Sequence, residues 1–190
     1  MMKSEDQWVI ELKERLNTEP TIQKLELKAF VKINLPYSAD LSYTFNVIDS
    51  EKIKKQNVLV KASCNAYQVD LLLTKNDKPF MAIECKMGGI STHGLVTYSD
   101  NAKKHKQLFP DLKYGLLLAD NNKGKNTLEK KIFMHDNSFD FITCIDSKLS
   151  NPILWKNMLD IINNAVIDDK LRREPRSVYC IEKREIYKAQ

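Results

Sequence analysis

The sequence predicts an α/β domain with a mixed sheet flanked by helices, and three observations lead to this class. An amphipathic helical pattern begins the chain, two apolar strands that resemble a hairpin occupy its middle, and a helix and a further strand follow them. A short hairpin joins antiparallel strands, whereas a crossover through a helix joins parallel ones. The chain has 190 residues, of which 43% are hydrophobic, which suits one domain with a sizeable core. We therefore expect a single domain over residues 1–190.

The first helix is predicted from residue 4 to about residue 17. Ser4 can cap it, because Gln7 stands three residues later and completes a capping box. The apolar residues of this segment recur at helical spacing and fall on one face: Trp8, Val9, Leu12 and Leu16.

Four strands are predicted before residue 88. Residues 25–33 and 41–48 have the alternation and the β-branched or aromatic content of strands, although the first is equally compatible with a helix. Residues 67–74 and 79–87 are predicted to form the central pair of strands, and the Asn-Asp sequence between them is typical of a tight turn.

The second half of the chain continues the alternation of helices and strands. A helix is predicted at residues 97–109, ended by Pro110, and the continuous apolar run 113–120 is typical of a strand buried on both faces. Short strands at 130–136 and 139–145 and a helix at 152–166 complete the prediction.

Three charged residues interrupt the apolar central pair: Asp70, Glu84 and Lys86. With residues 76–78 as the loop, Asp70 lies opposite Glu84, with Cβ atoms about 5 Å apart, and Lys86 shares the face of Glu84. Two carboxylates so close raise each other's pKa unless a cation lies between them. Oxygen ligands of this kind suit Mg²⁺ or Mn²⁺.

This convergence depends on the register of the hairpin. A regular two-residue turn at Asn76 and Asp77 would pair Asp70 with Ile83 and turn Glu84 to the other face. A three-residue loop or a one-residue bulge restores the convergence. We therefore expect an odd loop or a bulged ladder.

A divalent ion held by Asp70 and Glu84 can polarise a phosphate and lower the pKa of a bound water, while Lys86 stabilises negative charge. The residues that carry this chemistry resemble the signature of the PD-(D/E)XK nucleases: Asp70, thirteen intervening residues, then Glu84-Cys85-Lys86. Val69 stands where the signature has proline, which many members of the family lack. The resemblance covers residues 4–120.

The resemblance implies a restriction-endonuclease-like αβββαβ core, with residues 121–190 adding strands, a helix and a basic C-terminal segment. It implies that Asp70, Glu84 and the main-chain carbonyl of Cys85 bind the metal and that Lys86 is the catalytic lysine. The Cys85 side chain should point away from the metal, as a small buried hydrophobe. An ion pair between Asp70 and Lys86 on a solvated face is the plain alternative.

Two further residues are candidates for the same site. Glu5 matches a glutamate that many members of the family carry near the start of the first helix, although a first-turn acid is also favoured by the helix dipole alone. Gln68 lies two residues before Asp70 on the same strand face, where it could contact substrate or metal-bound water.

The net charge of +5 is mild, but eight lysines stand against three acids between residues 101 and 131. The same lysines are compatible with a solvated helix face. The predicted contacts with the phosphates of double-stranded DNA are Lys103, Lys104, Lys106, Lys123 and Lys125.

No run approaches the roughly 20 apolar residues of a membrane span, and the charged N-terminus does not resemble a signal peptide. The four cysteines are scattered without a CxxC pair, which favours reduced thiols. We expect a cytoplasmic protein without a membrane partner.

Together these features predict a Mg²⁺-dependent DNA endonuclease, most like a small type II restriction enzyme. A homodimer is expected, because one active site in each subunit must serve two scissile bonds. The alternatives are a structure-specific resolvase or repair nuclease, and a nucleic-acid-binding module of the same fold without catalysis.

Overall fold

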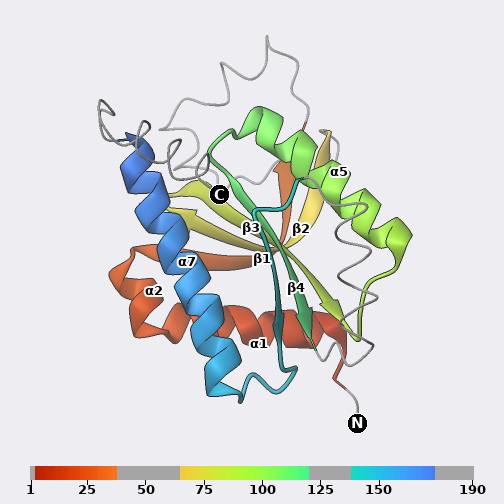
Figure 1. Cartoon of the computed structure of the whole chain (residues 1–190), viewed down its shortest axis with the longest axis vertical. Coiled ribbons are helices and arrows are strands. Elements are labelled where there is room, and N and C mark those ends of the chain that lie inside the picture. The colour runs from red at the N-terminus through yellow and green to blue at the C-terminus, as the bar shows by residue number, and fades with distance from the viewer. Residues whose placement is uncertain (1–2, 38–64, 120–137, 174–190) are drawn as a thin grey trace, which may run out of the picture.

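The computed structural model describes residues 3–37, 65–119 and 138–173 (Figure 1). The strands predicted at 41–48 and 130–136 lie outside these ranges. The elements follow the chain in this order: α1 (Glu5–Thr18), α2 (Pro20–Lys24), β1 (Leu27–Pro36), β2 (Ala66–Lys75), β3 (Lys78–Met87), α5 (Thr92–Leu108), β4 (Lys113–Ala119), β5 (Phe141–Ile145) and α7 (Pro152–Arg173).

The described strands form one five-stranded sheet in the order β1-β2-β3-β4-β5. The pairs β1–β2 and β2–β3 are antiparallel, whereas β3–β4 and β4–β5 are parallel. The crossover from β3 to β4 runs through α5, as the strand-helix-strand pattern predicts. The predicted α/β class with a mixed sheet is therefore confirmed.

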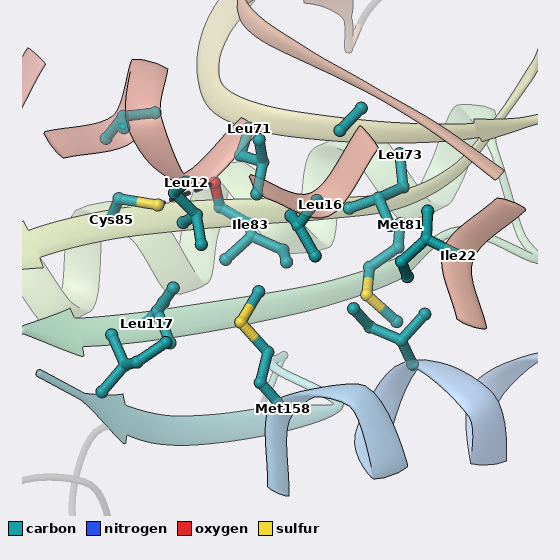
Figure 2. Close-up of a cluster of buried hydrophobic side chains, with 14 of the residues drawn as sticks. Leu12, Leu16, Ile22, Leu71, Leu73, Met81, Ile83, Cys85, Leu117 and Met158 are labelled. Carbon is teal, nitrogen blue, oxygen red and sulfur yellow. Dashed lines mark hydrogen bonds between the residues drawn. The ribbon is translucent and has the colours of Figure 1, made fainter. Parts of the chain in front are cut away.

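Helices cover both faces of the sheet, because the side chains of the central strands are apolar in both directions (Figure 1). On β2, Leu71 and Leu73 pack in the core cluster that contains residues of α1 and α7, shown in Figure 2. Leu72, between them, packs on the other face with Ala102 of α5. The sheet is the middle layer of three.

Helix α1 begins at the predicted cap. The Ser4 hydroxyl accepts from the Gln7 amide at 3.2 Å, and the Gln7 side chain accepts from the Ser4 amide at 3.3 Å. All four residues predicted to face inward are buried: Trp8, Val9, Leu12 and Leu16.

The end of α1 is tied to the backbone of β1. The Asn17 side-chain amide donates to the Ala29 carbonyl at 3.0 Å, and its oxygen accepts from the Ala29 amide at 2.8 Å. One side chain therefore satisfies both backbone groups of a strand residue.

The turn of the hairpin differs from the predicted three-residue loop. Lys75 pairs with Lys78, so the loop has two residues. Asn76 and Asp77 have φ angles of 51° and 59°, the left-handed conformation that a type I′ hairpin turn requires. The expectation of residues 76–78 as the loop is wrong, because this turn matches the twist of the strands better.

A bulge compensates for the short turn, as the alternative prediction required. Thr74 pairs with Pro79 but Leu73 pairs with Met81, so β3 carries one extra residue, Phe80. Beyond the bulge, the strands pair in the register that was predicted to bring Asp70 opposite Glu84. The last pair in this register is Leu71 with Ile83.

The other differences concern element boundaries. Residues 27–36 form a strand and not the alternative helix, and the short helix α2, which starts at Pro20, was not predicted. Helix α5 begins five residues earlier than expected, because the Ser91 hydroxyl caps it by accepting from the Gly94 amide at 3.0 Å. Helix α7 continues past residue 166 to Arg173.

Strand β4 is buried from Tyr114 to Ala119, as predicted. A Cβ atom on Gly115 would meet the ring of Phe141 on β5 at 2.0 Å, so glycine lets this ring lie against the strand. Among the described residues, none of the helices combines the length and the apolar composition that a membrane span requires.

Candidate active site

The candidate site lies where β2 and β3 pass beyond their last paired residues. Continuing the register from Leu71 and Ile83 places Asp70 opposite Glu84. Their side chains are buried, with 8% of Asp70 and 2% of Glu84 exposed. By strand alternation they share the face of Leu72 and Ala82, toward α5.

Asp70 has a full set of charged and polar partners. Its Oδ1 accepts from Lys32 Nζ at 2.7 Å, and its Oδ2 accepts from the Cys85 backbone amide at 2.9 Å. Lys32 lies on β1 between the residues that pair with Leu71 and Val69, and so directly opposite Asp70. A buried carboxylate thus has one cation and one amide donor.

Glu84 has a different environment, because the side chain that donates a hydrogen bond to it is an uncharged hydroxyl. The Tyr114 hydroxyl donates to Glu84 Oε1 at 2.6 Å. Burial raises the pKa of Glu84 to about 7, and the hydrogen bond from Tyr114 opposes this rise. The charge of Asp70 and a hydrogen bond shared with it raise the pKa further.

A buried histidine extends this network. His105 Nε2 lies 3.0 Å from the Leu35 carbonyl and its Nδ1 lies 3.3 Å from the Tyr114 hydroxyl. Burial lowers the pKa of His105 to about 4, so the ring is neutral at pH 7. A carbonyl only accepts, so Nε2 carries the proton and Nδ1 is unprotonated. Nδ1 lies beside a hydroxyl whose one proton is donated to Glu84, so this contact brings the ring close to the carboxylate without a second hydrogen bond from Tyr114.

Lys86 is held beside the carboxylates by the first turn of α1. Its Nζ donates to Glu5 Oε1 at 2.6 Å, and the Met87 amide donates to Glu5 Oε2 at 3.1 Å. Burial alone lowers the pKa of Lys86, but hydrogen bonds with Glu5 and Tyr98 outweigh it and raise that pKa above its ordinary value. Lys86 therefore carries its charge at neutral pH.

Lys32 has a second carboxylate within reach, also on α1. Its Nζ lies 3.1 Å from Asp6 Oδ1. Burial alone lowers the pKa of Lys32, but hydrogen bonds with Asp70 and Asp6 outweigh it and raise the pKa. The first turn of α1 thus supplies one acid to each lysine, Glu5 to Lys86 and Asp6 to Lys32.

Cys85 and Gln68 complete the set of predicted residues near the carboxylates. The Cys85 side chain is fully buried in the core cluster on the opposite face (Figure 2), as expected, and burial raises the pKa of its thiol. Its carbonyl as a metal ligand stays a prediction. Gln68 is exposed on β2, opposite Asn34, and a contact with substrate stays a prediction.

The lysines of α5 have partners away from the carboxylate pair. Lys104 contacts Asp100 at 2.7 Å and the Tyr67 hydroxyl at 3.3 Å. Lys106 donates to the Ser138 carbonyl and to Asp140. Lys103 is exposed, and the remaining two predicted phosphate contacts, Lys123 and Lys125, lie outside the described residues.

Sequence reasoning missed four residues of the site: Lys32, Asp6, Tyr114 and His105. Each of them acts across a strand or helix pairing that no local pattern encodes. The one available signal was Tyr114, a polar-tipped residue at the start of a fully buried strand, since a buried tyrosine hydroxyl usually finds a partner.

Within the described ranges, no group of three or more histidine, cysteine, aspartate or glutamate side chains is arranged to hold a metal ion. Two carboxylates are nevertheless sufficient protein ligands for Mg²⁺, which keeps several waters and binds substrate phosphate. No protein-family model matches the chain, and no curated protein matches its sequence. The arguments about function therefore rest on the site itself.

Proposed function

We propose that this protein is a metal-dependent endonuclease that hydrolyses DNA phosphodiester bonds, with Asp70 and Glu84 as metal ligands and Lys86 as the catalytic lysine. The observation that carries the proposal is the burial of two opposed carboxylates, one of which, Glu84, is also acted on by the charge of Lys86. Burying such groups costs folding free energy, which an apolar hairpin end would avoid.

The order of elements supports the finer fold assignment. Helix α1, strands β1 to β3, helix α5 and strand β4 follow one another as in the αβββαβ core of the PD-(D/E)XK nucleases. The two carboxylates and the lysine lie at corresponding places on the second and third strands. Type II restriction enzymes are the group that we favour within this class, with double-stranded DNA as substrate.

The donor set fits a hard divalent cation. Asp70 and Glu84 offer carboxylate oxygens only, which suit Mg²⁺ or Mn²⁺ better than softer metals. The pKa of Glu84 is raised to about 7 by burial and by Asp70, and a divalent charge at this place would lower it. The Cys85 carbonyl would be a third ligand.

When bound, Mg²⁺ would supply Lewis-acid activation of the scissile phosphate and of the attacking water. Lys86, fixed by Glu5, would place its charge against the negative charge that develops on the phosphate. The Tyr114 hydroxyl holds one oxygen of the Glu84 carboxylate in place by a hydrogen bond. Glu5 is a positioning residue in this scheme.

The test is incubation of supercoiled plasmid with the full chain and Mg²⁺, followed by mapping of the ends. Asp70→Asn and Glu84→Gln should each reduce cleavage by a factor of roughly 10³ or more, because loss of metal activation costs several kcal/mol. Glu14→Gln, which removes an exposed carboxylate on α1, is the matched control and should cleave normally. Full cleavage by either site variant, or cleavage in EDTA, would contradict the mechanism.

A second assay separates chemistry from binding. Lys86→Ala should lose turnover far more than DNA affinity, because its charge acts on the transition state. If the rate and the affinity fell by the same factor, Lys86 would be a binding residue. A four-way junction beside linear duplex in the same assay distinguishes a restriction enzyme from a resolvase.

A further inference from the structure

We propose that Lys32 is a resident counter-ion of the candidate metal site, which a divalent metal must displace from Asp70 and which then moves to Asp6. The inference rests on the proposed function and deepens it, because it assigns a regulatory role to a lysine outside the nuclease signature.

The first support is that Lys32 already lies between two carboxylates. Its Nζ is 2.7 Å from Asp70 Oδ1 and 3.1 Å from Asp6 Oδ1. Asp70 is buried, whereas 73% of the Asp6 side chain is exposed. The ammonium group therefore bridges an inner and an outer acceptor, and a small shift transfers it fully to the outer one.

The backbone of Lys32 gives an independent observation. Its φ is 52°, in the left-handed region that a lysine inside a strand rarely adopts. Lys28, the other lysine of β1, is not among the residues with positive φ. Such a conformation costs energy and persists where the surroundings enforce it, often at functional sites. Here it occurs at the β1 residue that lies opposite Asp70.

The partners of Asp70 explain why a metal and Lys32 compete. Oδ2 is engaged by the Cys85 amide, and Oδ1 is engaged by Lys32. A divalent ion that binds Oδ1 would lie within a few ångströms of the ammonium group, where like charges repel strongly in a partly buried site. Binding therefore requires Lys32 to withdraw, and Asp6 keeps it paired when it does.

The test is Mn²⁺ binding to the full chain without DNA, measured by isothermal titration calorimetry. Lys32→Met should bind Mn²⁺ roughly ten-fold tighter than the wild type, because the competing charge is gone. Lys28→Met removes a lysine from the same strand and should leave the affinity unchanged. Equal affinity of wild type and Lys32→Met would overturn the proposal.

Lys32→Gln is the second variant, in case Lys32→Met does not fold. Glutamine can still donate a hydrogen bond to Asp70 but carries no charge. It should also bind Mn²⁺ more tightly than the wild type, and circular dichroism in EDTA checks that each variant is folded. An affinity at or below that of the wild type would overturn the proposal.

Asp6→Asn tests the second half of the exchange. It should weaken Mn²⁺ binding in the wild type, where Lys32 then has no alternative partner, but not in the Lys32→Met background. A double-mutant cycle measures this dependence. An equal loss in both backgrounds would mean that Asp6 acts through its own charge, and would overturn its role as acceptor.

The same titrations separate failure of this inference from failure of the proposed function. Binding that Asp70→Asn abolishes, with equal affinity of wild type and Lys32→Met, would overturn the role of Lys32 alone. If neither the wild type nor Lys32→Met binds Mn²⁺, both the metal site and the exchange are wrong.

Discussion

The two ends of the β2–β3 hairpin are built from the same strands but depend on different interactions. Near the turn, the paired residues Leu73 and Met81 are fully buried among apolar side chains (Figure 2). Three positions farther along, Asp70 and Glu84 are also buried, but their partners are an ammonium group, an amide and a hydroxyl. One end of this hairpin therefore contributes apolar packing, whereas the other end presents the polar groups of the candidate site.

The two ends contribute differently to the free energy of folding. Apolar burial lowers the free energy of the folded state in proportion to area, whereas a buried carboxylate raises it unless its charge is compensated. Asp70 is compensated by Lys32, while Glu84 is compensated largely by a neutral hydroxyl. Truncation of Leu73 and removal of the charge of Glu84 should therefore change stability in opposite directions.

The largest expected effect is at the turn end. Leu73→Ala should lower the free energy of unfolding by about 3 kcal/mol, because it leaves a cavity in the core cluster. Urea denaturation in EDTA measures this loss, and Thr74→Ala, at the half-buried neighbouring position, is the control. A loss below about 1 kcal/mol would mean that this end does not supply the stability.

The opposite sign is expected at the site end. The pKa of Glu84 is raised from 4.5 to about 7 in the folded protein. Between these two pH values Glu84 is therefore protonated in the folded protein but ionised in the unfolded protein. The stability that this gives is complete below pH 4.5 and is lost as the pH rises through 7. Glu84→Gln should therefore stabilise the metal-free protein at pH 8 by on the order of 2–3 kcal/mol.

The advantage of Glu84→Gln should shrink toward pH 5, where the wild-type carboxyl is protonated. Urea denaturation at both pH values in EDTA measures it, with Glu14→Gln on the exposed side of α1 as the control. A variant that is less stable than the wild type at pH 8 would show that Glu84 carries no unfavourable charge.

A smaller effect is expected from the hydroxyl that contacts Glu84. Tyr114→Phe should lower the free energy of unfolding by about 1 kcal/mol, the usual net value of one hydrogen bond. It should also raise the pKa of Glu84 further, because the hydrogen bond from Tyr114 lowers that pKa. Carboxyl chemical shifts followed against pH by NMR measure the second effect, and an unchanged or lower pKa would contradict the assignment.

The smallest effect is expected in the turn itself. Asp77 has a φ of 59°, so Asp77→Gly should stabilise the hairpin by about 0.5 kcal/mol through relief of backbone strain. Asp77→Val should destabilise it, because a β-branched residue is strongly disfavoured in this conformation. Thermal unfolding of both variants gives the comparison, and equal stabilities would contradict the type I′ turn.

The sequence was sufficient for features that local patterns encode. The cap at Ser4, the inward face of α1 and the buried strand β4 follow from residue spacing alone. The register of the hairpin was harder, because a two-residue turn with a bulge at Phe80 places Asp70 opposite Glu84 just as a three-residue loop would. The sequence alone does not distinguish the three-residue loop from the two-residue turn with a bulge, because both place Asp70 opposite Glu84.

The missed residues depend on pairings between distant segments. Lys32 reaches Asp70 only through the register of β1 on β2 and through an unusual φ, neither of which its neighbours in sequence indicate. His105 joins the site through the Leu35 carbonyl and Tyr114, which come from two different strands. The early start of α5 was missed because the first turn contains Gly94, a weak helix former.

The bond between Asn17 and Ala29 has a consequence for how molecules of this protein meet one another. Strand β1 is the outermost strand on its side of the sheet that the described residues form, and an open strand is a template for aggregation by intermolecular strand addition. The Asn17 side chain engages both the amide and the carbonyl of Ala29. A strand from a second molecule therefore cannot extend the sheet through Ala29 unless it first displaces the last turn of α1.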